Sequence, residues 1–574
     1  MKPPAKWAHG AALAAVLIGS FLLKLHHLNH PGVKPLDEVF HAIVARNFLH
    51  HPLTPTLVDH PYAPYDYRNW RENYIWLHKP PVAMWQIALS FAVLGVNTLA
   101  LRLPSAILST LAAGLTYLIG AELLDRTTGL IAATLQAFNP VILMLLNGYV
   151  FSDHVDIALL FWTEFGIYFL CRSVRTGRWM DLSLCGIGQG VAFLSKSYPA
   201  LIVLGIAVVA WLLPRTRLLV KNQTVRPRFS SWSMAIILFV AGITALPWTF
   251  YTAIRFTDEF RHENLGILSH LDQNVEGWAA PWDRVMFDYW ISIFHVFYPA
   301  CLAAMIVLAA RAYRQRQLGL WLIFAWALGV IIPNLLATSK TMSSTLIAWP
   351  AIWLLLGHLI SLAIAGDLPS LGTWMAAALL AFSLHAKSIP AQGWGYASPG
   401  IAVIMRQHVW VFWQVLAAII TGALAAKFTS RAVLRRAMLM ISIAASLVLA
   451  LRWWRGDHPR GYGIVAWEVT RIDNQSPDFS ALAAYVSKMP ANAAFIVDEH
   501  TPLDNKLMEF AVDRSCYSLI VPDWRIQAIA LGQGGAVPYL VSATSQSLPV
   551  LFVDRQSNYT VYQCAPESRP APAK

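Results

Sequence analysis

Two charged motifs stand close together in a stretch that a membrane protein would ordinarily leave polar and featureless. The first, LDEVFHAIVAR at 36–46, places the carboxylates of Asp37 and Glu38 at the start of an amphipathic segment, which can rest on a membrane with its acids at the N-terminal end. The second, HKPPVAMWQIALSFAVL at 78–94, opens with Lys79 ahead of two prolines. Carboxylates and a cation beside two amphipathic segments predict an active site at a membrane surface.

The composition places the chain among membrane proteins. Of the 574 residues, 57% are hydrophobic and only 13% are charged, and the mean hydropathy is +0.50. Because a helix needs about 20 mostly apolar residues to cross a bilayer, we expect an all-α polytopic membrane bundle of about thirteen transmembrane helices. The expected spans are 9–28, 104–123, 129–147, 155–172, 182–196, 198–213, 232–254, 288–310, 318–336, 345–364, 371–387, 409–425 and 437–453.

Lysine and arginine recur in alternate loops, as they do on the cytoplasmic side of membrane proteins. This pattern predicts a multi-pass protein of the plasma (inner) membrane with a cytoplasmic N-terminus and an extracytoplasmic C-terminal tail. The same loops account for the net charge of +12, and because they form no single basic face, no nucleic-acid partner is expected. The basic loops are 172–178, 215–228, 311–316 and 427–436.

The chain divides into two predicted domains. Residues 1–456 form the membrane domain, whose first outer loop, 29–103, contains the juxtamembrane helices. Residues 457–574 lose the long apolar runs, and their alternation of helical and strand-like segments predicts a small extracytoplasmic α/β domain. An oxidising compartment would permit Cys516 and Cys564 to pair, but their spacing leaves that open.

Four segments together give the chain a resemblance to a known superfamily. They are the DE-x-x-x-x-x-x-A-R pattern at 37–46, the KPP at 79–81, GVNTLALRLPSAI at 95–107 and GQGVAFLSKSYPALIVL at 188–204. In this order they resemble the GT-C type glycosyltransferases that use polyprenol-phosphate sugars, which include protein O-mannosyltransferases and aminoarabinose lipid A transferases. The resemblance covers roughly residues 10–360. It implies transfer of a sugar from a polyprenyl phosphate to an acceptor on the outer face.

The resemblance implies catalytic roles for two acidic positions. Asp37 matches the acid of the family's first loop and is the leading candidate for a general base or an acceptor-orienting carboxylate, with Glu38 second. An N-cap of the following helix is the alternative for Asp37. The family has another acid at the position of SDHVDIALLF, 152–161, where Asp156 fits the spacing better than Asp153 but the choice stays open.

Three lysines are expected at outer helix ends, which are normally depleted of cations. Lys79, Lys196 and Lys340 match family positions and are the candidates for binding the donor phosphate, with snorkelling side chains as the alternative. Arg102 is either a fourth such cation or one half of a structural ion pair. Candidate contacts to acceptor or sugar are His78, Arg261, Glu263 and Asn264.

The substrates remain a matter of class. The expected partners are a polyprenyl-phosphate sugar and a lipid, glycan or protein acceptor. No cofactor is firmly expected, although two carboxylates near a phosphate would suit a divalent cation. His78 stands where aminoarabinose transferases typically have Glu, which leaves the sugar unassigned. A transporter or flippase of a lipid-linked substrate, and a surface-polysaccharide polymerase or ligase, are the alternatives.

Overall fold

The computed structural model describes residues 6–365, 367 and 477–564, with gaps at 29–31, 36, 151–152, 217–228, 276, 281–284, 286–288, 295–296, 502 and 522. Most of the described chain is helical. The helices of the first part are α1 Lys6–Leu28, α2 Asp37–Asn47, α3 Val82–Leu94, α4 Thr98–Leu123, α5 Arg126–Ala137, α6 Pro140–Leu146, α7 Asp153–Thr176, α8 Trp179–Lys196, η1 Tyr198–Leu201, α9 Ile202–Leu212, η2 Leu213–Arg215, α10 Ser231–Arg255, α11 Thr257–Ser269, α12 Trp290–Phe294, α13 Tyr298–Gln315, α14 Leu318–Leu336, η5 Met342–Ala348 and α15 Trp349–Ala365.

The prediction of a helical multi-pass membrane bundle is confirmed. Within the described residues, seven helical segments are long and apolar enough to cross a membrane, or eight if the bent pair α5 and α6 forms one span. The expected spans at 182–196 and 288–310 correspond to α8 and to α12 with α13, which are helical but are not among those seven. The last three expected spans, 371–387, 409–425 and 437–453, lie outside the described residues.

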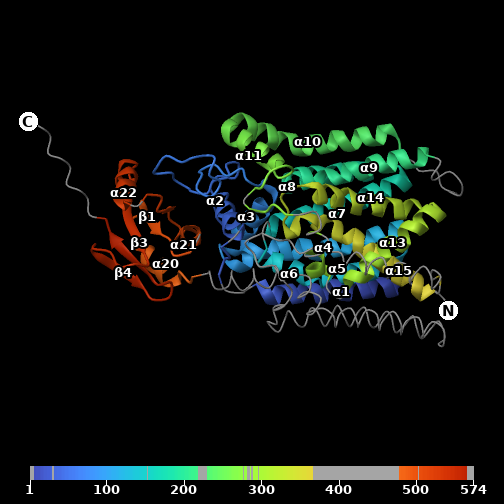
Figure 1. Ribbon diagram of the computed structural model, residues 1–574, viewed down its shortest axis with the longest axis horizontal. Coiled ribbons are helices and arrows are strands. Elements are labelled where there is room, and N and C mark those ends of the chain that lie inside the picture. The colour runs from blue at the N-terminus through green and yellow to red at the C-terminus, as the bar shows by residue number, and fades with distance from the viewer. Residues whose placement is uncertain are drawn as a thin grey trace, which may run out of the picture.

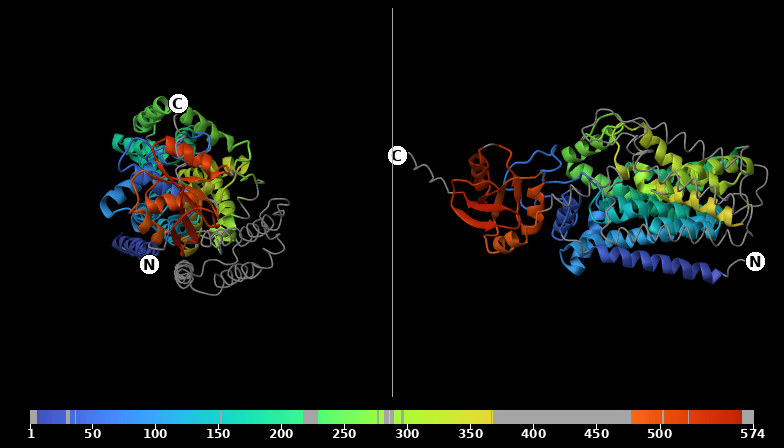
Figure 2. Two further views of the ribbon diagram at one scale, coloured as in Figure 1. Left: turned by 90° about the vertical axis from the view of Figure 1, so that its left-hand side faces the viewer. Right: turned by 60° about the horizontal axis from the view of Figure 1, so that its bottom comes forward.

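The bundle helices run side by side along the long axis of the molecule, and a small sheet-containing part projects from one end (Figures 1 and 2). We call this part, residues 477–564, the sheet unit. The start of α1 lies at the opposite end of the bundle, whereas α2 lies at the end that carries the sheet unit (Figure 1). The two termini of the described chain therefore point to opposite ends of the bundle.

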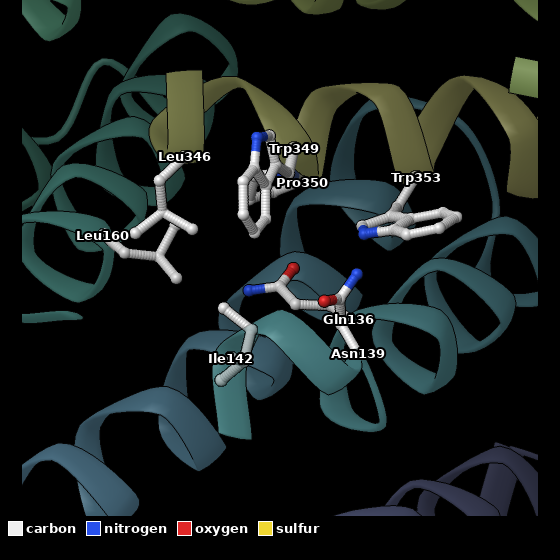
Figure 3. A pocket seen from close by; sticks show the side chains of 8 residues that line it. All are labelled: Gln136, Asn139, Ile142, Leu160, Leu346, Trp349, Pro350 and Trp353. Atoms are coloured by element: carbon white, nitrogen blue, oxygen red, sulfur yellow. The ribbon is translucent and has the colours of Figure 1, made fainter. Parts of the chain in front are cut away.

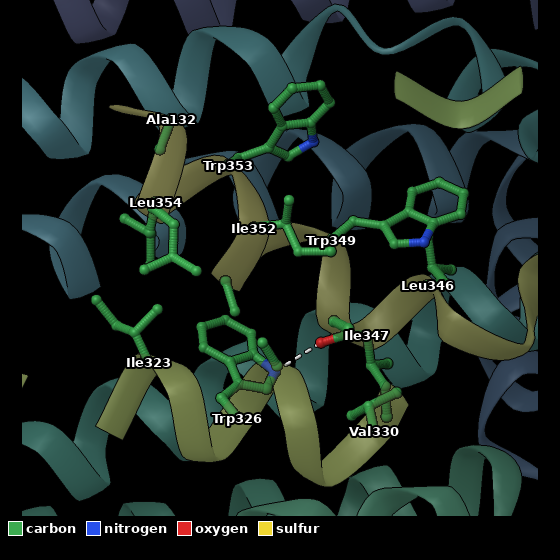
Figure 4. Packing of buried hydrophobic residues seen from close by; sticks show 14 of the residues in the cluster. Ala132, Ile323, Trp326, Val330, Leu346, Ile347, Trp349, Ile352, Trp353 and Leu354 are labelled. Carbon is green, nitrogen blue, oxygen red and sulfur yellow. Dashed lines mark hydrogen bonds between the residues drawn. The ribbon is translucent and has the colours of Figure 1, made fainter. Parts of the chain in front are cut away.

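Close helix contacts and buried tryptophans hold the bundle together. The α4 and α5 helices approach at Gly120 and Gly129, where an added Cβ on Gly129 would collide with the backbone of Tyr117. In the interior, the indole of Trp326 on α14 donates a 2.6 Å hydrogen bond to the carbonyl of Ile347 (Figure 4). This bond satisfies a polar group that would be costly to leave unpaired in an apolar core.

The sheet unit combines helices α20 Ser480–Val486, α21 Asp504–Val512 and α22 Trp524–Gln533 with strands β1 Ala493–Asp498, β2 Cys516–Ser518, β3 Val537–Ser542, β4 Val550–Asp554 and β5 Tyr559–Gln563. The strand order is β2-β1-β3-β5-β4, with β1 parallel to β2 and β3 and with β5 antiparallel to its neighbours. The short strand β2 therefore forms one edge. The small α/β unit predicted for this part of the chain agrees with these elements, while the predicted boundary at 456 lies outside the described residues.

The two cysteines of the sheet unit are free and buried. Cys516 lies in β2 and Cys564 follows β5, so strands β1 and β3 separate them. Three strand spacings amount to about 14 Å, which is well beyond the reach of a disulfide. The pairing that the sequence leaves open is not formed.

We expect Gly129→Ala to lower the stability of the bundle by about 1–3 kcal/mol, because the new methyl group would force α4 and α5 apart. The matched control is Gly205→Ala in α9, where an added Cβ meets nothing within 4 Å. Thermal unfolding in detergent, followed by tryptophan fluorescence, measures both variants. Equal melting temperatures for the two would contradict the close approach.

Candidate active site

The helix α2 carries the acidic pair and is covered by protein on all sides. Its eleven residues are all buried, so the expectation that this segment rests on the membrane surface is wrong. Phe40 packs in parallel with the indole of Trp76, at 6.3 Å between ring centroids, and Arg46 reaches the sheet unit. The helix lies between the bundle and the sheet unit. Its apolar side chains therefore pack against neighbouring protein and not against a bilayer.

A buried ion pair fixes the start of α2. Both carboxylate oxygens of Glu38 accept hydrogen bonds from the guanidinium of Arg102, at 2.7 and 2.9 Å, and the backbone N–H of Lys34 donates a third at 2.7 Å. Burial alone would raise the pKa of Glu38, but the charge of Arg102 outweighs it and holds that pKa well below its usual range. Gly148 lies so close that a Cβ there would stand 2.6 Å from the carboxyl carbon of Glu38. The geometry thus favours the structural alternative for Arg102 and a structural role for Glu38.

A second carboxylate, Asp153, faces α2 from the first turn of α7. Its Oδ1 lies 2.7 Å from Nδ1 of His41, and both side chains are fully buried. Burial lowers the pKa of His41 to about 4, against the opposing charge of Asp37, so the imidazole is neutral at pH 7. Neither Nε2 of His41 nor Oδ2 of Asp153 has a hydrogen-bond partner within the described part of the chain. Such unused polar atoms are typical of a site that binds a ligand or water.

Asp37 stands one helical turn before His41, on the same side of α2. Its charge acts on both His41 and Asp153, so the three groups are close enough to interact electrostatically. The residue Asp37 is 8% exposed. Asp37 is therefore the more accessible of the two acids that open α2, since Glu38 is completely enclosed.

The second acidic pair of the sequence divides into two different environments. Asp156 lies one turn after Asp153 on α7 and forms a 2.5 Å ion pair with Lys196 at the end of α8. The charge of Lys79 acts on both Asp156 and His41. Two of the three predicted phosphate-binding lysines, Lys79 and Lys196, are thus brought to the carboxylates, and both are only partly buried.

The third predicted lysine has a different environment. The ammonium of Lys340 donates hydrogen bonds to the carbonyls of Ala280 and Ala337, and the residue is 2% exposed. These bonds help to fold the connection between α14 and η5, and Tyr289 donates a bond to the Lys340 carbonyl. Lys340 therefore has an evident structural function, and its binding of the donor phosphate stays a prediction.

One of the predicted contacts on α11 reaches the site. Glu263 lies 3.0 Å from Nδ1 of His78, whose ring stacks on Trp70 at 4.5 Å between centroids. Arg261 is exposed, and the side-chain amide of Asn264 donates to the carbonyl of Phe260 within its own helix. The structure therefore joins His78 to Glu263 and leaves Arg261 and Asn264 apart from them.

A small gap lies between α5, α6, α7, η5 and α15. Its lining residues are Gln136, Asn139, Ile142, Leu160, Leu346, Trp349, Pro350 and Trp353 (Figure 3). None of the predicted site residues is among them. We assign the candidate site to the carboxylates and lysines around α2 because they carry reactive groups, which this largely apolar space lacks.

Among the described residues, no group of three or more His, Cys, Asp and Glu side chains is arranged to hold a metal ion. A divalent cation at α2 would therefore need further oxygen ligands, such as those of a bound phosphate. The residues best placed to approach it are Asp37 and Asp153.

Comparison with known proteins agrees with this fold. A family model described as dolichyl-phosphate-mannose-protein mannosyltransferase matches residues 78–255. An undecaprenyl phosphate-alpha-4-amino-4-deoxy-L-arabinose arabinosyl transferase from Pseudomonas paraeruginosa is 27% identical over 202 residues, which are 33% of this chain and 34% of that protein. A protein of the same name from Pseudomonas savastanoi is 24% identical over 268 residues, or 45% and 44% of the two chains. The matched part spans about a third to a half of these relatives.

Solved structures match over almost the whole chain. ArnT from Cupriavidus metallidurans bound to undecaprenyl phosphate has a TM-score of 0.61 at 14% identity, covering 98% of both chains. The oligosaccharyltransferase AglB from Archaeoglobus fulgidus, in complex with an inhibitory peptide and a dolichol-phosphate, has a TM-score of 0.50 at 13% identity, covering 92% of this chain and 69% of AglB. The predicted resemblance to the GT-C superfamily is confirmed in the fold.

His41 is a candidate that was not singled out from the sequence. Its spacing from Asp37 is four residues, which places both side chains along one face of a helix, so a signal was present. The partner of His41, Asp153, is 112 positions away, and no spacing within α2 indicates it.

Removing Arg102 should strongly destabilise the protein. We expect Arg102→Ala to cost about 3–5 kcal/mol, because Glu38 would be left as an uncompensated buried charge. Arg175→Ala is the control, since Arg175 pairs with Glu122 at an exposed position where such pairs contribute about 0–1 kcal/mol. Melting temperatures in detergent compare the two, and a loss no larger for Arg102 than for Arg175 would refute the anchoring role.

Proposed function

We propose that the protein is an integral membrane glycosyltransferase that moves a sugar from a polyprenyl-phosphate donor to an acceptor hydroxyl or phosphate on the extracytoplasmic face. The observation that carries this proposal is the grouping of Asp37, Asp153, Lys79 and Lys196 at the sheet-bearing end of a bundle whose fold matches a structure with bound undecaprenyl phosphate. Acids and cations are both needed for this chemistry, and the sequence predicts that all four lie on one side of the membrane.

The proposed reaction uses these groups in two roles. An acceptor oxygen attacks the anomeric carbon, a new carbon–oxygen bond forms, and the bond from that carbon to the phosphate oxygen breaks. Asp37 takes the acceptor proton when the acceptor is a hydroxyl, or orients the acceptor when it is a phosphate. The ammonium groups of Lys79 and Lys196 stabilise the negative charge of the departing polyprenyl phosphate.

The neutral imidazole of His41 and the carboxyl group of Asp153 lie close to Asp37. Their unused atoms, Nε2 and Oδ2, provide hydrogen-bonding positions beside Asp37. We propose that they orient the acceptor or a sugar hydroxyl. The two Pseudomonas relatives are named for an aminoarabinose donor. In this chain His78 stands where such transferases typically have Glu, and it contacts Glu263 and Trp70. We therefore assign the donor only as a polyprenyl-phosphate hexose or pentose.

The membrane topology forms part of the proposal. We place the N-terminus in the cytoplasm and the sheet unit outside, with thirteen spans in total, on the strength of the basic loops and the opposite positions of α1's start and the sheet unit (Figure 1). A divalent cation held jointly by Asp37, Asp153 and donor phosphate oxygens is a further proposed partner.

A transporter or flippase of a lipid-linked substrate is the second candidate. Glu164 on α7 is fully buried within a span, where Thr116 and Gln136 donate hydrogen bonds of 2.7 Å to it. Ionisable groups inside spans are typical of transport pathways. Because Glu164 has partners for both oxygens and the described cations lie elsewhere, we rank this candidate below the transferase.

We expect Asp37→Asn to lower sugar transfer by about 10²–10⁴-fold, since the amide cannot accept the acceptor proton. The purified variant should bind the donor as the wild type does, because it retains the lysines. Asp59→Asn, an exposed acid of the same outer loop, is the control and should transfer normally. Transfer from a polyprenyl-phosphate sugar in detergent or nanodiscs measures all three proteins, and full activity of Asp37→Asn would exclude Asp37 as the base.

We expect Lys79→Ala to weaken donor binding by about tenfold, the effect of losing roughly 1.4 kcal/mol of charge-assisted contact. Native mass spectrometry of the purified protein detects a co-purified polyprenyl-phosphate sugar, identifies its mass and follows its loss in the variant. Lys488→Ala, at an exposed position of the sheet unit, is the control. Retention of the glycolipid in Lys79→Ala would exclude Lys79 from the phosphate site. In a separate assay in vesicles, translocation of the lipid-linked sugar without its transfer would favour the transporter.

A further inference from the structure

We infer that the sheet unit is a positioning element for the candidate active site, acting through the loop at residues 55–76. This inference rests on the proposed function, because it assigns positioning residues for the same reaction. The loop leaves the bundle beside α2 and reaches over the sheet unit (Figure 1). Its two ends are close to the site, while its tip contacts residues more than 400 positions later in the chain.

The base of the loop is closed by the loop's own backbone. Thr56 and Ile75 form an antiparallel bridge, Leu57 N–H donates to the carbonyl of Tyr74 at 3.0 Å, and Trp76 N–H donates to the carbonyl of Pro55 at 2.8 Å. The two arms of the loop are therefore held together at its base. A displacement at the tip can be carried to the base, where His78 and Lys79 follow.

One side of the tip is held by charge. The carboxylate of Glu72 accepts hydrogen bonds from Asn505 at 2.8 Å and from Ser518 at 2.9 Å, and it lies 3.7 Å from the ammonium of Lys506. Lys506 is fully buried and also forms a 3.0 Å ion pair with Glu509 on the same helix, α21. A buried lysine requires such partners, so Glu72 supplies part of what makes this position of Lys506 stable.

The other side of the tip is held by close backbone contact. Tyr62 N–H donates to the hydroxyl of Tyr517 at 3.1 Å, and the carbonyl of His60 accepts a 3.3 Å hydrogen bond from Ser515. Gly534, after α22, packs directly on the Tyr62 backbone, where a Cβ would collide with it. Tyr517 belongs to the edge strand β2, so the loop covers the open edge of the sheet.

Aromatic rings connect the loop to the site. The fully buried Trp76 packs on Phe40 and lies 6.0 Å from the ring of His41, both on α2. The Trp76 indole donates to the carbonyl of Trp70 at 3.1 Å, and Trp70 in turn stacks on His78. Contacts of the loop therefore reach the helix that carries Asp37 and the turn that carries Lys79.

The helix α21 also holds the far end of α2 directly. Arg46 donates hydrogen bonds of 3.2 Å to the carbonyls of Glu509 and Phe510 and pairs with Asp513 at 3.0 Å. These carbonyls lie at the C-terminal end of α21, where a cation is favoured. One helix of the sheet unit thus fixes both α2 and the loop that packs on it.

Two substitutions test the inference at different contacts. Gly534→Ala pushes on the backbone of Tyr62, and its control, Gly532→Ala, adds the same methyl group two residues earlier where nothing lies within 4 Å. Glu72→Gln removes the charge that faces Lys506 but leaves the Lys506–Glu509 pair, and its control is Asp66→Asn at an exposed position of the loop. We expect both test variants to lower kcat for sugar transfer about tenfold, with the donor KM changed less than twofold, because misplaced groups slow the reaction more than they weaken binding of the lipid.

Hydrogen–deuterium exchange on the full-length protein gives a readout that does not require turnover. In both test variants, amides of 37–47 and 55–76 should exchange faster while strands β1 and β3 stay protected, and the controls should match the wild type. Unchanged kcat and unchanged exchange in both folded variants would overturn the inference. If the wild type transfers no sugar from any polyprenyl phosphate, the proposed function fails, and the exchange data still decide whether the sheet unit orders α2 and the loop.

Discussion

The candidate site depends first on the buried ion pair between Glu38 and Arg102. Besides its two bonds to Glu38, the guanidinium donates to the carbonyls of Leu28, at the end of α1, and Gly32. His154 on α7 stands 3.5 Å from the same carboxylate, and Gly148 leaves room for it. A buried pair of this kind gains little net stability over apolar packing, but it tolerates few alternative arrangements. It therefore fixes where α1, α2, α4 and α7 meet, and with them the direction in which Asp37 points.

The buried polar groups around α2 differ in whether all of their polar atoms have hydrogen-bond partners. Together with nearby backbone groups, Glu38 and Arg102 leave no side-chain polar atom unpaired, whereas Asp153 and His41 share one hydrogen bond and leave an atom each without a partner among the described residues. Leaving buried polar atoms unpaired costs about 1–3 kcal/mol each, and a protein accepts such a cost where a substrate or water later supplies the partner. The contrast separates the groups that build the site from those that we propose act in it, although Glu38, His41 and Asp153 all lie in the first two turns of α2 or α7, and only Arg102 comes from α4.

Much of this could be read from the sequence, because charged residues stand out in an apolar chain. The acids of α2 and α7 and the lysines Lys79 and Lys196 were all named as candidates from the sequence, because each was predicted to lie on the outer side of the membrane, and the structure brings them together. The pairing of Glu38 with Arg102 stayed open because sequence gives no distance between groups 64 positions apart. The burial of α2 was missed for a related reason: an amphipathic helix looks the same whether a bilayer or a domain covers its apolar face, and here the covering residues come near the end of the chain.

The loop at 55–76 has almost no secondary structure of its own, and ordering each of its residues costs about 1–2 kcal/mol of conformational entropy. Its base gains contacts from the bundle and its tip from the sheet unit, while the edge strand β2 gains the cover that an open sheet edge requires. Each part therefore completes the other. Because α2 and the Lys79 turn pack on this loop, we infer that the carboxylates and lysines reach their arrangement only when the loop and the sheet unit have both folded and met.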